Sequence, residues 1–219
     1  MRITSLQPQA TNADRVNIFV DGHFLLGVSL LSVVKMGLRV GLDLTEQQLQ
    51  QLREEEAVQQ AVGRALNFLS FRPRSREEIR RYLRRKETAP ALIDTVLERL
   101  EHLELVDDRG FATFWIESRE RFQPKGAQAI KNELRMKGVA RDVVDELVDD
   151  EQDEERALVA GRKKALTLLN QSTLDYNTFR SRLGPFLQRR GFSYEVVSRT
   201  VRTLWQELGG AQDQDGDTE

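Results

Sequence analysis

Several features that would assign a function directly are missing from this 219-residue chain. It contains no cysteine, which excludes disulfide bonds and thiolate metal sites. Its longest apolar stretch, Phe24–Val34, is about half of the roughly 20 residues that a membrane-spanning helix needs. The N-terminus lacks the basic flank, apolar core and cleavage site of a signal peptide. We therefore expect a cytoplasmic protein with no membrane segment.

Enzymatic patterns are weak as well. Residues 22–29 read GHFLLGVS, which has the glycine spacing of a phosphate loop but lacks its lysine. The two histidines, His23 and His102, lie far apart without the spacing of metal ligands. Asp107 and Asp108 stand where a helix is expected to begin, which favours helix capping over acid–base catalysis. We expect no enzymatic activity, no metal and no cofactor.

Charge is nearly balanced overall but unevenly distributed. The net charge of −2 does not favour a simple polyanion binder. Residues 57–106 nevertheless hold ten basic and seven acidic side chains, with the basic ones concentrated in Phe71–Lys86, while an acidic run lies at Asp142–Glu155. Segregated charge is typical of a protein with a macromolecular partner, although each run is equally compatible with a solvated helix face.

An internal repeat is the most informative pattern. With Leu83, Leu134 and Leu187 as anchors, intervals of 51 and 53 residues align about twenty residues without a gap. The aligned positions share an apolar residue one turn before the anchor, a basic residue three positions after it and an aliphatic pair further on. The matching sets are Ile79/Ile130/Leu183, Lys86/Lys137/Arg190 and Leu92-Ile93/Val143-Val144/Val196-Val197.

Each repeat contains three apolar stripes at helical spacing, which predicts three helices. Ser75 with Glu78 predicts a capping box at the start of a second helix, and Pro90 suits the first turn of a third. The predicted first-helix stripes are Val58/Ala61/Val62/Ala65/Leu66/Leu69 and Leu158/Ala165/Leu166/Leu169.

Two aligned glycines are predicted to end the second helices. Gly138 and Gly191 each follow a second helix, where a glycine in the left-handed conformation commonly stops the chain from continuing as a helix. Glu87 occupies the same position in the first repeat. The geometry of that first turn is therefore not fixed by the glycine argument.

The N-terminal segment has a different pattern. Val16–Val20 and His23–Val28 flank Asp21-Gly22, which predicts a β-hairpin with a two-residue turn. Short helices are expected over about residues 29–36 and over Glu46–Leu52, the second one capped by Thr45. An isolated hairpin is only marginally stable, so it must dock on the helices or on a partner.

The predicted fold is thus all-α: three tandem three-helix repeats in an elongated curved array, with a small N-terminal β-hairpin extension. Residues 57–207 should be almost wholly helical, and all strands should lie before residue 30. The predicted boundaries are residues 1–56 for the extension, 57–106, 107–150 and 151–208 for the three repeats, and 209–219 for a disordered acidic tail.

The basic ends of the second helices are the candidate binding surface. Guanidinium and ammonium groups at equivalent positions of successive repeats could meet acidic protein surfaces or phosphates. They could also serve only as partners of the helix dipoles. The candidates are Arg80, Arg81, Arg84, Arg85, Lys86, Lys131, Arg135, Lys137, Arg189 and Arg190.

Three stretches resemble the RecX family of regulators over about residues 57–207. They read ALNFL…RPRSREEIRRYLRRK, LEHLELVDDRGFATFWIESR and PKGAQAIKNELRMKGVARDVV. The N-terminal hairpin is similar to an extension found in a subset of that family. The resemblance implies a non-enzymatic protein that binds the RecA recombinase filament, usually lowering its ATPase and strand-exchange activity by blocking growth or favouring disassembly. We expect a monomer.

Two alternatives stay open. Short helices joined by tight turns also resemble helix-turn-helix units, so the chain could bind single- or double-stranded DNA directly through its basic patches. That function would need a basic recognition helix in more than one repeat, and the first repeat alone is clearly basic. The other alternative is a general scaffold made of helical repeats.

Overall fold

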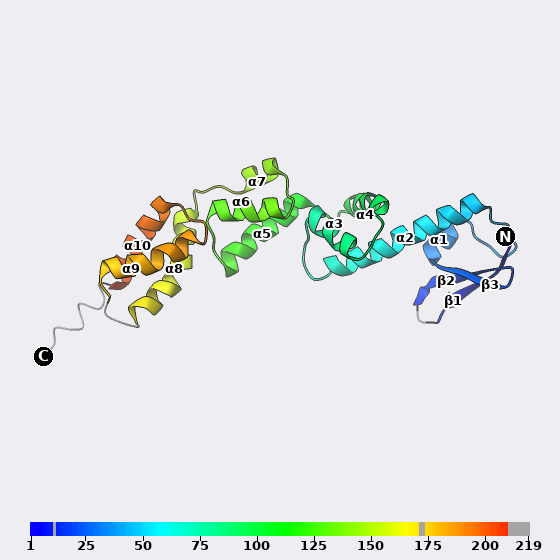
Figure 1. Cartoon of the computed structure of the whole chain (residues 1–219), viewed down its shortest axis with the longest axis horizontal. Helices are drawn as coiled ribbons and strands as arrows, with labels where there is room; N and C mark the ends of the chain where they lie inside the picture. The colour runs from blue at the N-terminus through cyan, green and yellow to red at the C-terminus, as the bar shows by residue number, and fades with distance from the viewer. Residues whose placement is uncertain (11, 171–173, 210–219) are drawn as a thin grey trace. The chain divides into compact units, whose positions relative to one another are not determined.

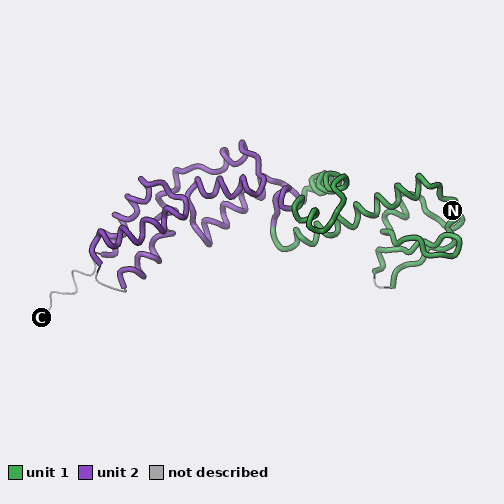
Figure 2. The backbone as a smooth tube through the Cα atoms, in the orientation of Figure 1, with its two compact units in different colours: residues 1–72, 79–105 green, residues 73–78, 106–219 purple. Residues whose placement is uncertain are grey.

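A computed structural model describes residues 1–10, 12–170 and 174–209 (Figure 1). Contacts divide the chain into two compact units, residues 1–72 with 79–105 and residues 73–78 with 106–219 (Figure 2). None of the helices in the described ranges is long and apolar enough to cross a membrane. The predicted tail, except residue 209, lies outside the described residues.

The described residues form a three-stranded sheet and ten helices. In chain order they are β1 Ile3–Gln9, β2 Asn12–Val20, β3 His23–Ser29, α1 Leu30–Lys35, α2 Glu46–Leu69, α3 Arg76–Arg85, α4 Pro90–His102, α5 Asp108–Phe122, α6 Ala127–Met136, α7 Arg141–Leu147, α8 Asp153–Leu169, α9 Tyr176–Gln188 and α10 Tyr194–Gly209.

The N-terminal sheet corrects the all-α prediction in part. The predicted hairpin is confirmed, with Val20 opposite His23 around Asp21-Gly22, but β1 adds a third antiparallel strand in the order β1-β2-β3. The sequence of β1 does not alternate apolar and polar residues, and Pro8 lies within it. Its pairing is irregular at both ends, as suits an edge strand.

The sheet docks on α2, which is longer than predicted. Thr45 caps this helix in a capping box with Gln48, as expected for the cap, but the helix continues unbroken past Leu52 to Leu69 and crosses the predicted boundary between residues 56 and 57. Glu56, 4% exposed, holds the sheet: its carboxylate accepts the backbone N–H of Ser29 at 3.0 Å and pairs with Arg15 at 2.6 Å.

The three three-helix repeats are confirmed. The second part of α2 with α3 and α4 forms the first, α5–α7 the second and α8–α10 the third. In the described part of the chain every strand ends by Ser29. Two stripe assignments are wrong, because Leu66 and Leu166 are 41% and 43% exposed at the solvent-facing edge of their helices. The elongated, curved arrangement of the repeats stays a prediction.

The second helices of the first two repeats are capped by the repeat that follows. The backbone N–H of Arg76, at the start of α3, donates to the Asp108 carboxylate at 2.8 Å. The backbone N–H of Ala127, at the start of α6, donates to the Asp153 carboxylate at 2.9 and 3.1 Å. Asp108 and Asp153 are each the first residue of the next repeat's first helix. One carboxylate therefore satisfies an orphan donor and links two repeats.

The turn that follows the second helix of one repeat contacts the start of the second helix of the preceding repeat. Ser75 Oγ donates to the carbonyl of Lys137 at 2.6 Å, and the backbone N–H of Gly126 donates to the carbonyl of Arg190 at 3.0 Å. Ser75 also accepts the N–H of Glu78, which confirms the Ser75 half of the predicted capping box. The same contact thus joins the second repeat to the first and the third repeat to the second.

The predicted left-handed glycines are confirmed, and the structure gives two reasons why glycine is needed at these positions. Gly138 and Gly191 both have φ of +84°. A Cβ on Gly138 would lie 2.4 Å from the Cβ of Glu77, and a Cβ on Gly191 would lie 2.4 Å from the Cβ of Ala129. Glycine is therefore required by the close approach of the preceding helix as well as by the backbone conformation.

Glu87 makes the same turn without a glycine. Its φ is +56°, so the first repeat keeps the left-handed geometry. A left-handed conformation costs an L-residue roughly 1–2 kcal/mol. Glu87 is exposed, and its turn has no preceding repeat on which to dock. At Glu87, therefore, no neighbouring helix excludes a side chain, and the positive φ is the one remaining reason to prefer glycine.

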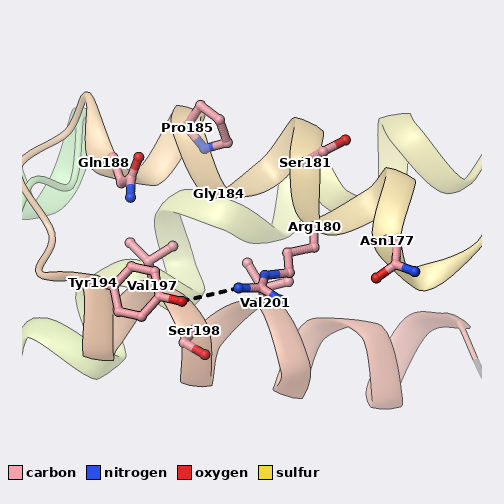
Figure 3. A pocket seen from close by; sticks show the side chains of 10 residues that line it. All are labelled: Asn177, Arg180, Ser181, Gly184, Pro185, Gln188, Tyr194, Val197, Ser198 and Val201. Carbon is pink, nitrogen blue, oxygen red and sulfur yellow. Dashed lines mark hydrogen bonds between the residues drawn. The ribbon is translucent and has the colours of Figure 1, made fainter.

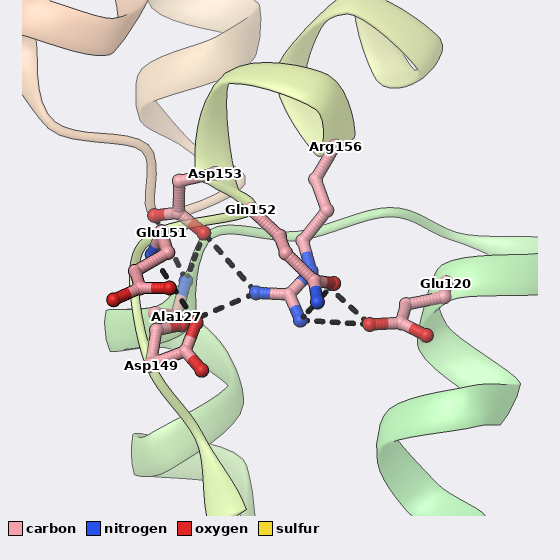
Figure 4. A network of polar contacts seen from close by, with 7 residues as sticks. All are labelled: Glu120, Ala127, Asp149, Glu151, Gln152, Asp153 and Arg156. Carbon is pink, nitrogen blue, oxygen red and sulfur yellow. Dashed lines mark hydrogen bonds and ion pairs between the residues drawn. The ribbon is translucent and has the colours of Figure 1, made fainter.

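A buried polar network reinforces the junction between the second and third repeats (Figure 4). Asp153 and Arg156 are 5% and 8% exposed. The guanidinium of Arg156 contacts the Asp153 carboxylate at 3.4 Å and the Glu120 carboxylate at 2.7 Å. Burial raises the pKa of the Asp153 carboxyl, although the N–H of Ala127 and the charge of Arg156 oppose the rise.

The glycine contact predicts a stability change. Gly138→Ala should lower the free energy of unfolding by about 1–3 kcal/mol. The alanine would have to adopt a left-handed backbone conformation, and its methyl group would clash with the side chain of Glu77. Urea unfolding measures this difference. Gly63→Ala is the matched control: Gly63 lies in α2 with open space around it, so this change should leave stability equal or raise it. Equal stability of the two variants would contradict the docking contact.

The Asp153 network predicts a pH dependence. Because the folded state raises the pKa of Asp153 above its ordinary value, the folded chain takes up this proton more readily than the unfolded chain. The contribution of Asp153 to stability should therefore improve as pH falls through the raised pKa toward the ordinary value. The asparagine side chain in Asp153→Asn cannot titrate, so wild type should gain unfolding free energy relative to this variant between about pH 7 and pH 4.

The comparison should be run by urea unfolding with Asp142→Asn as a control for the lost charge, since Asp142 is exposed. If the unfolding free energy of wild type relative to Asp153→Asn stays constant as pH falls, folding leaves the pKa of Asp153 at its ordinary value; if it decreases, folding lowers that pKa. Either result would contradict the raised pKa.

Candidate functional site

The basic end of α3 combines residues used inside the fold with residues that face solvent. Arg80 pairs with Asp94 of α4 at 2.9 Å, and Arg81 also has a partner within the chain. Arg84 and Arg85 occupy the last turn of α3 and are exposed. Neither of these two side chains has an ion-pair partner among the described residues.

Lys86 extends this exposed end. It is exposed, and its ammonium lies 6.0 Å from the centre of the Tyr82 ring. Tyr82 itself stacks on Phe68 of α2, with ring centres 4.2 Å apart. The tyrosine therefore packs the end of α3 against α2, while the cations beyond it stay at the surface.

In the second repeat the predicted cations gather around one carboxylate. Lys131 and Arg135 of α6 lie 3.7 and 3.0 Å from Asp145 of α7, and Arg141 lies 3.3 Å from it. Burial raises the pKa of Asp145, but the three cations outweigh it and leave that pKa below its ordinary value. These side chains join α6 to α7, and their positive charge is partly compensated.

Lys137 belongs to a junction between repeats. Its ammonium pairs with Glu78 at 2.7 Å and lies 3.9 Å from the centre of the Trp115 ring. The lysine side chain is 19% exposed. Lys137 therefore ties the second repeat to the start of α3 and is held by an acid and an aromatic ring.

Arg190 plays the same part in the third repeat. Its Nη1 donates to the carbonyl of Pro124 at 3.2 Å, and its guanidinium lies 4.6 Å from the centre of the Phe186 ring. Arg189, the C-cap of α9, is exposed. The sequence placed Arg189 and Arg190 together, whereas the structure gives them different surroundings.

The candidate site therefore reduces to a cationic end on the first repeat, made of Arg84, Arg85 and Lys86, with Arg189 as a further exposed cation on the third repeat. Lys137 and Arg190, at the positions aligned with Lys86, are used for docking on a preceding repeat. Because the first repeat has no predecessor, its end stays exposed. That several of the ten basic residues lie along one side of the array of repeats stays a prediction.

Two exposed aromatic residues escaped the sequence-based site. Phe71 and Phe122 are 83% and 71% exposed, and they stand 51 residues apart at aligned positions before the second helices. The alignment could have found them, since each is followed two residues later by a proline. Exposed aromatic side chains are common anchors of protein interfaces.

The site offers charged and aromatic contacts rather than reactive groups. Within the described ranges, no cluster of three or more His, Asp or Glu residues could hold a metal ion. The exposed cations suit binding to carboxylates or phosphates of a macromolecular surface.

Comparison with known proteins assigns four segments, which together make up most of the chain, to one family. Residues 1–45 match the regulatory protein RecX N-terminal domain. Residues 61–100, 107–147 and 150–201 match the first, second and third three-helix domains of RecX.

Whole proteins agree with these matches. The chain is 30% identical to the regulatory protein RecX of Bacillus subtilis over 199 residues, which cover 91% of this chain and 75% of that protein. It is 29% identical to the regulatory protein RecX of Listeria welshimeri over 98% of this chain and 80% of that one.

Solved structures share the fold. A crystal structure of regulatory protein RecX matches with a TM-score of 0.72 at 24% identity, covering 90% of this chain and 97% of that chain. A crystal structure of RecX from Lactobacillus salivarius matches with a TM-score of 0.57, also at 24% identity, over 68% of this chain and 97% of that one. The sheet, the three repeats and these matches together show that the chain belongs to the RecX family of regulatory proteins.

Proposed function

We propose that this chain binds RecA nucleoprotein filaments and lowers RecA ATPase activity, filament growth and strand exchange. Membership of a family that modulates RecA supports this function. The observation that carries the proposal to particular residues is the exposed cationic end of the first repeat, where Arg84 and Arg85 face solvent.

Electrostatics favours this end over its counterparts. A cation already held by a carboxylate must lose that contact before it binds a partner, which cancels part of the gain. Lys137 is held by Glu78, and Lys131 and Arg135 share Asp145. Arg84, Arg85 and Lys86 bear no such cost, because they have no ion-pair partner among the described residues, so they supply most of the charge-dependent affinity for the filament.

Repetition in the chain suits a partner that repeats. Three equivalent helical units, arranged as the predicted curved array, would contact successive RecA protomers along the filament. We further propose that the chain acts as a cytoplasmic monomer, since a periodic filament supplies several contacts to a single copy.

Direct DNA binding is the second candidate function. The exposed arginines at the end of α3 favour it, because guanidinium groups bind phosphates well. The second repeat argues against it, with eight basic and ten acidic residues between positions 107 and 150. Measuring binding to naked single- and double-stranded DNA beside the RecA filament separates the two functions.

Charge reversal tests the proposed surface. Arg84→Glu combined with Arg85→Glu should weaken binding to RecA filaments on single-stranded DNA several-fold and reduce its dependence on salt, because two solvent-facing cations are lost. Stability should fall by no more than about 1 kcal/mol from the helix dipole. Biolayer interferometry at several salt concentrations gives the affinity, and urea unfolding gives the stability.

Arg53→Glu with Lys163→Glu is the matched control, since both positions are exposed helix sites and the net charge change is the same. The control should keep wild-type affinity. If the Arg84/Arg85 variant folds and binds the filament as tightly as wild type, the binding surface lies elsewhere. If wild type binds naked DNA as tightly as the filament, the second candidate function replaces the first.

A further inference from the structure

The third repeat contains a groove at a place where the first two repeats each hold an ion pair. The groove has a volume of about 380 Å³ and lies between α9 and α10 (Figure 3). Val197 and Val201 supply apolar surface, and Gly184 and Pro185 form the wall on α9. Arg180 of α9 donates to the hydroxyl of Tyr194 of α10 at 3.1 Å, and this hydrogen bond links the two helices that line the groove (Figure 3).

The repeat alignment shows how the groove arises. Gly184 is aligned with Arg80 and Lys131, and Ser198 is aligned with Asp94 and Asp145. In the first repeat the two positions form an ion pair of 2.9 Å, and in the second an ion pair of 3.7 Å. The third repeat has lost both the cation and the acid.

The residues at this place in α9, Gly184 and Pro185, are unfavourable inside a helix. Glycine inside a helix costs roughly 0.5–1 kcal/mol relative to alanine. Pro185, which follows inside α9, has no N–H, so the carbonyl of Ser181 lacks its usual donor four residues later. Conflicts between sequence and local structure are expected where function imposes them.

The charge around the groove indicates the partner. α9 contains Arg180 and Arg182 and neither Asp nor Glu, and Arg189 follows it directly. On the opposite wall, Glu195 of α10 is engaged by Arg199. An apolar floor beside arginines that have no ion-pair partner among the described residues suits an acidic segment that carries an apolar side chain.

We propose that this groove receives an acidic segment of a RecA protomer, with one apolar side chain inserted between α9 and α10. The proposal rests on the proposed function and adds a second contact, distinct from the cationic end of the first repeat. The chain's own residues 210–219 are acidic, but Ala211 is their largest aliphatic side chain, too small to fill the apolar floor. In the segment, a backbone N–H would meet the carbonyl of Ser181, and acidic groups would meet Arg180.

Closing the groove tests the proposal. Gly184→Lys combined with Ser198→Asp recreates the ion pair of the second repeat without changing the net charge. This variant should bind RecA filaments on single-stranded DNA about tenfold more weakly, because one large apolar side chain loses its site. Leu166→Lys with Gln206→Asp is the control: both positions are exposed and lie outside the groove lining, and filament affinity should stay at the wild-type value.

A second variant covers the case in which the closed variant does not fold. Tyr194 is 66% exposed, so Tyr194→Glu should keep the fold, and its new charge should repel the acidic segment and weaken filament binding several-fold. A folded closed variant, or Tyr194→Glu, that binds as tightly as wild type overturns the groove proposal and leaves the proposed function intact. Absence of filament binding by wild type overturns both.

Sedimentation velocity identifies a competing occupant. If wild type forms a dimer that the closed variant cannot form, the groove belongs to a second copy of this chain and the RecA assignment is wrong. A monomer for both proteins, together with the loss of filament affinity, is the expected result.

Discussion

The contact between a tight turn and the first residues of the preceding second helix is the constraint on which the repeats depend. The last residue before the turn's glycine accepts a hydrogen bond through its carbonyl from Ser75 or Gly126. The glycine itself lies so close to the helix that a Cβ would clash with it. Glycine at positions 138 and 191 is the residue that allows both. The aspartate beginning the next repeat then caps the same helix end, so packing and hydrogen bonding select one register between neighbours.

The two ends of the series depart from this contact, each for a physical reason. In the first repeat the turn does not pack against a preceding second helix, and Glu87 adopts the left-handed conformation at an exposed position. At the third repeat, α9 is capped by its own Asp175, which accepts the N–H of Thr178 at 2.8 Å. Terminal units of repeat proteins commonly differ from internal ones in this way. Here the differences leave a cationic end on one terminal repeat and a groove on the other.

Much of this architecture could be predicted because it is local in the sequence. The helical stripes, the Asp21-Gly22 hairpin, the Thr45 cap and the two glycines all follow from patterns of a few residues. β1 was missed because an edge strand with an irregular register needs no alternating pattern. The predicted break after Leu52 was wrong because a single helix, α2, serves both parts of the fold. Its first half packs against the N-terminal sheet, and its second half is the first helix of the first repeat.

The candidate site was less predictable, since it depends on which cations find partners across the fold. Lys86, Lys137 and Arg190 are indistinguishable in the alignment, but Glu78 lies 59 residues from Lys137 and Pro124 lies 66 residues from Arg190 along the chain. Only three-dimensional packing separates a cation held in a junction from one left at the surface. The groove of the third repeat likewise results from losing a pair whose members are fourteen residues apart.

Hydrogen–deuterium exchange of the chain, free and bound to RecA filaments on single-stranded DNA, tests the central claim most directly. The claim is that the turn after α3 is a free binding end, whereas the turns after α6 and α9 are already engaged. Binding should slow exchange at residues 84–88 and change it little at residues 136–139, which the junction with the first repeat protects in the free chain. Equal slowing at these two turns, or none at residues 84–88, would contradict it.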